Sequence, residues 1–185
     1  MNETYKVQVQ DLVDDLKAVF THAGLGGEAG EYKLLTQSFL YKFLNDKFLY
    51  QAKVLDESNT YENLLAMSEE DYDWLLEDIG TSTAWLKPDQ LIESLHRKQN
   101  EATFYETFEN TLNQIAIDNN DIFSVHTDGD TAIRLFDERL ITDTISDSSK
   151  RSEVAKAIIN LLARVKFDET IFSQGFDFFS TLFEY

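Results

Sequence analysis

The stretch from Gly30 to Lys53 is the feature that most constrains the fold of this 185-residue chain. Beyond Gly30 it contains neither Gly nor Pro, and its apolar residues recur at steps of three and four, as in a helix. The apolar stripe is wide and comprises Tyr32, Leu35, Phe39, Leu40, Phe43, Leu44, Phe48 and Leu49. A stripe this wide needs burial on more than one side. The pattern therefore predicts a long central helix, about residues 30–55, surrounded by the other helices of a bundle.

The composition supports an all-α, single-domain chain over residues 1–185. One Pro and seven Gly favour long helices over a turn-rich β architecture, and 14 Phe with 8 Tyr supply a core. Helical periodicity also covers residues 4–23 and 103–119. Ser68 is predicted to cap a short helix over residues 69–79, which turns Tyr72, Leu75, Leu76 and Ile79 inward and ends at Gly80, and Pro88 is predicted to begin another helix. A further helix is expected to follow a cap at Ser148 and Ser149. Within residues 124–145, where an irregular or β segment is expected, residues 124–131 are polar and predict a loop, whereas residues 132–145 have mixed periodicity, so a short helix and a brief strand both stay open there.

Other features of the sequence indicate the cellular location of the protein. The absence of Cys excludes disulfides and thiolate chemistry, and it fits a reducing cytoplasm. No apolar run approaches the length of a membrane span, and the N-terminus lacks the basic and apolar regions of a signal peptide. We expect a cytoplasmic protein with no membrane partner.

The charge is strongly acidic and unevenly distributed. The net charge is −18, of which residues 1–138 contribute −17, whereas residues 139–166 carry +3. Such acidity is consistent with solubility, with a surface for a basic partner or with DNA mimicry. Because phosphate contacts come from Lys and Arg, the candidates for contact with DNA or a partner lie on the central helix and in the basic segment: Lys33, Lys42, Lys47, Lys150, Arg151 and Arg164.

The chain lacks the common signatures of catalysis and of metal or phosphate binding. The glycines between Gly24 and Gly30 are not followed by the Gly-Lys-Ser/Thr of a phosphate loop. His126 stands near Asp128 and Asp130, but the other two histidines show no ligand spacing. Nine carboxylates between residues 56 and 78 indicate a solvated acidic face. We therefore expect no metal site and no catalytic residues.

The central stretch also resembles a known family. Glu31-Tyr32-Lys33, followed by Leu35, Phe39, Leu40, Lys42, Phe43, Leu44, Asp46, Lys47 and Phe48, resembles the first signature of the modification (methyltransferase) subunit of type I restriction-modification systems. The resemblance continues in family order through Trp85–Leu91 with its Pro88, through Asn119–Phe123, and to Phe183-Glu184-Tyr185.

This resemblance implies the N-terminal helical domain of an adenine-N6 DNA methyltransferase from a prokaryotic cytoplasm. The parent protein would transfer a methyl group from S-adenosylmethionine to DNA. It would do so in a complex with a specificity subunit, a second modification subunit and a restriction subunit. The domain would serve assembly and clamping around DNA, and residues 171–185 would form a linker helix into a catalytic domain beyond this chain.

The chain itself should bind no cofactor and catalyse nothing. A single proline excludes the Asn-Pro-Pro-aromatic motif that holds a flipped adenine, and no Gly-rich cofactor turn follows a strand. An alternative interpretation, based on charge alone, is a stand-alone acidic helical protein that mimics DNA or serves as a protein-interaction module.

Overall fold

The computed structural model describes residues 3–120, 136–167 and 169–173. In these ranges every regular element is a helix, which confirms the all-α prediction. The elements are α1 (Glu3–His22), α2 (Ala29–Leu55), α3 (Tyr61–Ala66), α4 (Glu69–Ile79), a 3-10 turn η1 (Pro88–Gln90), α5 (Ile92–Arg97), α6 (Phe104–Asp118), α8 (Leu140–Thr144), α9 (Arg151–Arg164) and α10 (Glu169–Ser173).

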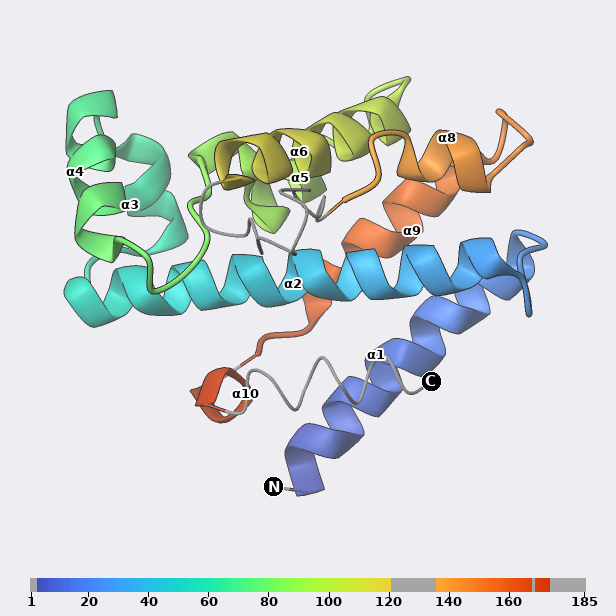
Figure 1. Cartoon of the computed structure of the whole chain (residues 1–185), viewed down its shortest axis with the longest axis horizontal. Coiled ribbons are helices and arrows are strands. Elements are labelled where there is room, and N and C mark those ends of the chain that lie inside the picture. The colour runs from blue at the N-terminus through green and yellow to red at the C-terminus, as the bar shows by residue number, and fades with distance from the viewer. Residues whose placement is uncertain (1–2, 121–135, 168, 174–185) are drawn as a thin grey trace, which may run out of the picture.

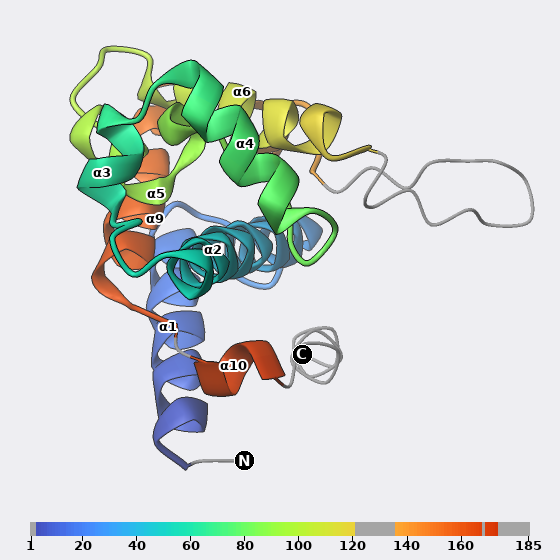
Figure 2. The same ribbon diagram turned by 90° about the vertical axis from the view of Figure 1, so that its left-hand side faces the viewer.

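Helix α2 is the axis of the fold, as its wide apolar stripe predicts. It runs the length of the molecule in Figure 1, with α3 to α6 and α8 above it, α9 passing behind it and α1 running obliquely below it. Figure 2 views α2 nearly end-on and shows neighbouring helices on several sides of it. Phe39 and Phe48 are fully buried, and the chain forms one continuous apolar core. Tyr32 departs from the predicted stripe, since it is 40% exposed near the start of the helix.

The remaining helices bury one face each. Helix α9 packs against α1, α5 and α6, and it also touches α2 and α8. Helix α4 packs against α2 through its predicted inner face, where the ring centroid of Tyr72 lies 6.4 Å from that of Phe48. This arrangement leaves the opposite face of α4 to solvent.

The helix ends show which sequence signals were reliable. Ser68 caps α4 as predicted, because its Oγ accepts a hydrogen bond from the amide of Asp71. Gly80 ends the same helix with a φ of 59°, a conformation that suits glycine. The cap expected from Ser149 is wrong, since its hydroxyl donates to Asp147 in a preceding turn and α9 begins after Lys150 without a side-chain cap.

Two further expectations have mixed outcomes. Of residues 124–145, the described part forms the short helix α8, so no strand is found between residues 136 and 145. Residues 124–135, which include His126, lie outside the described residues, and so does the end of the expected linker helix at 174–185.

The sequence pattern does not predict helix α3. The side chain of Thr60 caps this helix by accepting a hydrogen bond from the amide of Asn63.

Candidate functional site: two polar rows on the central helix

Four polar residues interrupt the apolar surface of α2 at its middle. Tyr41 and Asn45 are one helical turn apart and form a first row, and Lys42 and Asp46 form a second row beside it. All four side chains are buried. A buried polar group is costly unless it is hydrogen-bonded, so the partners of these four residues decide what the rows do.

The first row binds the backbone on both sides of Leu91, at the end of η1 and the start of α5. The Tyr41 hydroxyl donates to the carbonyl oxygen of Gln90 at 2.6 Å, and Asn45 Oδ1 accepts the amide of Ile92 at 2.8 Å. Leu91 between them has an extended backbone, with φ −68° and ψ 146°. The row therefore supplies one donor and one acceptor to a segment that has no neighbouring strand.

The second row binds residues 165–167 in the same way. Lys42 Nζ donates to the carbonyl oxygen of Val165, and Asp46 Oδ2 accepts the amide of Phe167 at 2.8 Å. The Lys42 ammonium also lies 2.9 Å from Asp46 Oδ2 and 5.6 Å from the centroid of the Phe167 ring. Asn45 Nδ2 donates to Asp46 Oδ1 at 2.8 Å and so joins the two rows. Each backbone group and each charge in this cluster has a partner.

Burial changes the acid–base properties of both rows. Desolvation lowers the pKa of Lys42, although the attraction of Asp46 opposes this effect. Desolvation, with a contribution from Asp89, holds the pKa of Tyr41 well above its ordinary value. The Tyr41 hydroxyl therefore stays protonated as a donor, and Lys42 releases its proton more readily than a surface lysine does.

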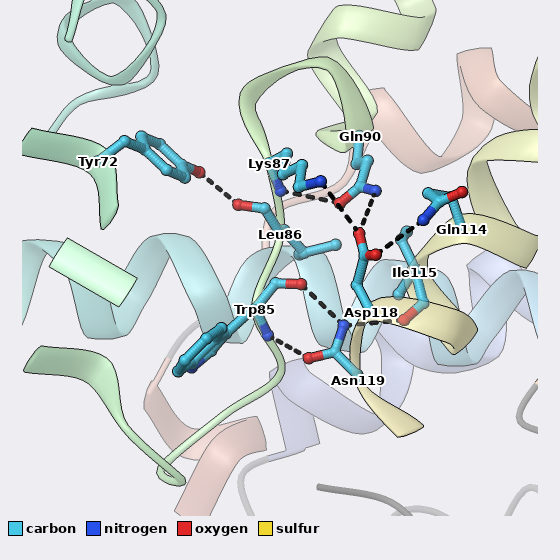
Figure 3. Close-up of polar contacts among 9 residues, drawn as sticks. All are labelled: Tyr72, Trp85, Leu86, Lys87, Gln90, Gln114, Ile115, Asp118 and Asn119. Carbon is cyan, nitrogen blue, oxygen red and sulfur yellow. Dashed lines mark hydrogen bonds and ion pairs between the residues drawn. The ribbon is translucent and has the colours of Figure 1, made fainter. Parts of the chain in front are cut away.

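A second polar cluster holds the segment that leads into the first row (Figure 3). The buried side chain of Asn119, at the end of α6, accepts the amide of Trp85 at 2.7 Å and donates to the carbonyl oxygens of Trp85 and Ile115. On the other side of the segment, the Tyr72 hydroxyl of α4 donates to the carbonyl oxygen of Leu86. The segment is thus fixed to α4 and α6 before it reaches α2.

Asp118 extends this cluster toward the surface (Figure 3). It accepts hydrogen bonds from Gln90 at 3.1 Å and from Gln114 at 2.7 Å, and Lys87 Nζ lies 3.7 Å away. Gln90 in turn accepts the amide of Lys87, which closes the 3-10 turn. The predicted helix start at Pro88 is therefore a single turn, after which the chain re-extends at Leu91 before α5 begins.

A surface pocket of about 530 Å³ opens between the two segments that the rows bind. The second half of α2 and the residues around Ile92 and Val165 form its walls, and Lys42 and Asp46 contribute to its lining. Its other charged lining residues have both signs: Lys53, Glu93, Lys166 and Glu169. The volume suits a small ligand, but this mixed charge selects no ligand class.

The predicted contact residues on α2 have three different environments. Lys33 is exposed and forms a surface ion pair with Asp137 at 3.3 Å. Lys47 is half-buried, with its Nζ 5.8 Å from the centroid of the Phe43 ring. Lys42, expected as a contact to DNA or a partner, is 3% exposed and bound to Asp46 and Val165, so its ammonium does not face solvent.

The predicted contact residues at the start and along α9 also lie in different environments. Lys150 and Arg164 are exposed at opposite ends of the helix, roughly 20 Å apart at 1.5 Å per residue. Arg151 is half-buried; its Nε donates to the carbonyl oxygen of Ile145 at 2.8 Å, and its guanidinium lies 5.7 Å from the Tyr105 ring centroid. The six candidates therefore do not form one patch, and Arg151 has a structural role.

The sequence pattern assigns no role to Tyr41 or Asn45, and Asp46 and Asn119 enter it only as members of the family resemblance. One signal was present: a Lys and an Asp four residues apart inside an apolar helix are placed to pair. No comparable signal pointed to Asn119, because its partner Trp85 is 34 positions earlier in the sequence.

The described residues contain no group of three or more His, Asp or Glu that could hold a metal ion. No helix in the described ranges is both long and apolar enough to cross a membrane.

Removing one charge of the second row should strongly destabilise the fold. Asp46→Asn keeps an acceptor for Phe167 but leaves the buried ammonium of Lys42 uncompensated, which should cost about 3–5 kcal/mol. Urea unfolding measures this loss. The matched control is Lys33→Met, which breaks an exposed pair and should change the free energy of unfolding by less than about 1 kcal/mol. Equal effects of the two substitutions would contradict the role assigned to the second row.

Lys42 should titrate below the surface lysines. Between its folded pKa and that of an unfolded lysine, the unfolded chain binds one proton more than the folded chain. The contribution of Lys42 to the free energy of unfolding therefore rises with pH in that window. Carbon NMR of the lysine Cε atoms, assigned with Lys42→Arg, measures the pKa directly. A Lys42 signal that titrates at the ordinary pKa of a lysine side chain would refute the buried environment.

Comparison of the chain with protein-family models, with curated proteins and with solved structures finds no match. The function of the chain is therefore inferred from its sequence and from the chemistry of the two polar rows.

Proposed function

We propose that this chain is the N-terminal helical domain of a type I modification subunit. The parent protein would transfer a methyl group from S-adenosylmethionine to adenine N6 in DNA. In this proposal the domain carries no catalytic group. It serves assembly and clamping around DNA in a complex that also contains a specificity subunit, a second modification subunit and a restriction subunit.

The observation that carries the proposal is the position of the polar residues in the stretch that resembles the family. An ordinary amphipathic helix explains Phe39, Phe43 and Phe48, but it gives no reason for Lys42 and Asp46 on a buried face. In the structure these two residues bind Val165 and Phe167. Two polar residues of the resemblance, Lys42 and Asp46, are thus the ones that bind the segment after α9.

This geometry suits a domain that must orient a neighbouring domain of the same protein. Residues 165–167 are bound to the middle of the longest helix, and α10 is placed next to them by Phe172, whose ring lies 5.7 Å from that of Phe43 and 5.4 Å from that of Tyr50. A chain leaving the bundle at this point would have a fixed direction. We infer that this rigidity transmits the position of the helical domain to a catalytic domain in the parent protein.

The native gene product provides the first test. We expect a protein much larger than 21.4 kDa that methylates adenine N6 in the presence of S-adenosylmethionine and a specificity subunit. Intact mass and mass spectrometry of digested DNA give the two readings. A native product that ends at Tyr185 and methylates no DNA would refute the proposal and favour the acidic DNA mimic.

Contacts with DNA are best tested at the exposed basic ends of α9. In the full complex, Lys150→Gln with Arg164→Gln should reduce the slope of log affinity against log salt by about two, if each side chain contacts one phosphate. Arg151 is left unchanged because it supports the fold. The control pair is Lys6→Gln with Lys98→Gln, which removes the same charge from two other exposed positions. An unchanged slope in the α9 variant would exclude α9 from the DNA interface.

A further inference from the structure

Helix α4 has an outer face that combines a large aromatic side chain with unpaired charge. Trp74 is 60% exposed, the second most exposed large apolar side chain among the described residues after Val54. Its neighbours one turn away on the helix surface are all carboxylates: Glu70 and Asp71 on one side, Glu77 and Asp78 on the other. We call these five residues the α4 face.

Several acidic residues elsewhere in the described ranges pair with Lys, Arg or His. Glu62 and Glu93 pair with Arg97, and Asp118 pairs with Lys87. By contrast, Glu70, Asp71, Glu77 and Asp78 are exposed and form no ion pair among the described residues. The α4 face therefore presents four uncompensated negative charges around one indole ring.

The α4 face is also rigid. The inner face of the helix is buried through Leu75, Leu76 and Ile79, and the Tyr72 hydroxyl is bound to the carbonyl oxygen of Leu86. Ser68 caps the first turn. Trp74 contributes little to this packing, so a binding partner would meet a preformed surface, and substitutions at Trp74 would leave the fold intact.

We propose that the α4 face docks a basic segment of a partner protein, with Arg or Lys side chains placed over Trp74 and against the surrounding carboxylates. Tryptophan is among the residues enriched at the energetic centres of protein interfaces, and its ring attracts cations. The four carboxylates supply the complementary charge and repel nucleic acid and anionic membranes. A metal site is not supported, since these carboxylates form no group that could hold an ion. This inference does not depend on the methyltransferase proposal.

The test uses the full chain labelled with 5-fluorotryptophan. Its two tryptophans give two fluorine NMR signals, which Trp74→Phe assigns. The probe is a synthetic 20-residue amphipathic helix with Arg on both flanks of a Leu stripe. We expect the Trp74 signal to shift saturably and the Trp85 signal to stay in place. Trp74→Ala should weaken binding at least about tenfold, whereas Ile117→Ala, at a similarly exposed site, should not.

A charge-matched pair of variants separates local docking from general attraction to an acidic protein. Glu70→Lys with Glu77→Lys reverses two charges beside Trp74, and Asp11→Lys with Asp15→Lys makes the same change on exposed positions of α1. We expect only the first pair to weaken binding by about tenfold or more. Equal weakening by both pairs, an unmoved Trp74 signal or no binding of the peptide would each overturn the proposal. A peptide with Glu in place of Arg should not bind.

Discussion

The structure depends on the way α2 satisfies backbone groups that no helix or sheet satisfies. Two segments cross α2 where one helical element ends and before the next continues, and each presents a carbonyl oxygen and an amide two residues apart. Two side chains one turn apart on α2 meet them: Tyr41 with Asn45, and Lys42 with Asp46. The rows take the place of a neighbouring strand. Without them, four buried backbone groups would lack partners, each at a cost of about 1–3 kcal/mol.

The use of a charged pair in one row and a neutral pair in the other has a physical consequence. A buried ion pair adds little net stability, because desolvation offsets most of the attraction, yet losing one partner is expensive. Only an arrangement that pairs Lys42 with Asp46 while both reach residues 165–167 is acceptable. An apolar pair would permit the segment to slide along α2. We infer that the charged row defines the position of residues 165–167 more than it adds stability.

The sequence predicted the elements whose signals are local, and it missed those that depend on contacts between distant residues. The period of Phe39, Phe43 and Phe48 was sufficient to predict α2 and its burial, and Ser68 and Gly80 marked the ends of α4. Lys42 was assigned to the surface because its charge was considered alone, although Asp46 stood one turn away. The hydrogen bonds between Asn119 and the Trp85 backbone could not be inferred, since nothing local in the sequence relates these residues, which are 34 positions apart.

The distribution of charge separates two kinds of surface on one rigid support. Exposed cations stand at both ends of α9, whereas the α4 face carries only carboxylates around Trp74. Helix α2 contacts both α4 and α9, so the two surfaces are held by the same axis. A DNA mimic would need its carboxylates arranged with a spacing that resembles phosphates. An exposed tryptophan amid the carboxylates is more typical of a protein interface. The surface of this chain therefore favours an assembly module over a mimic.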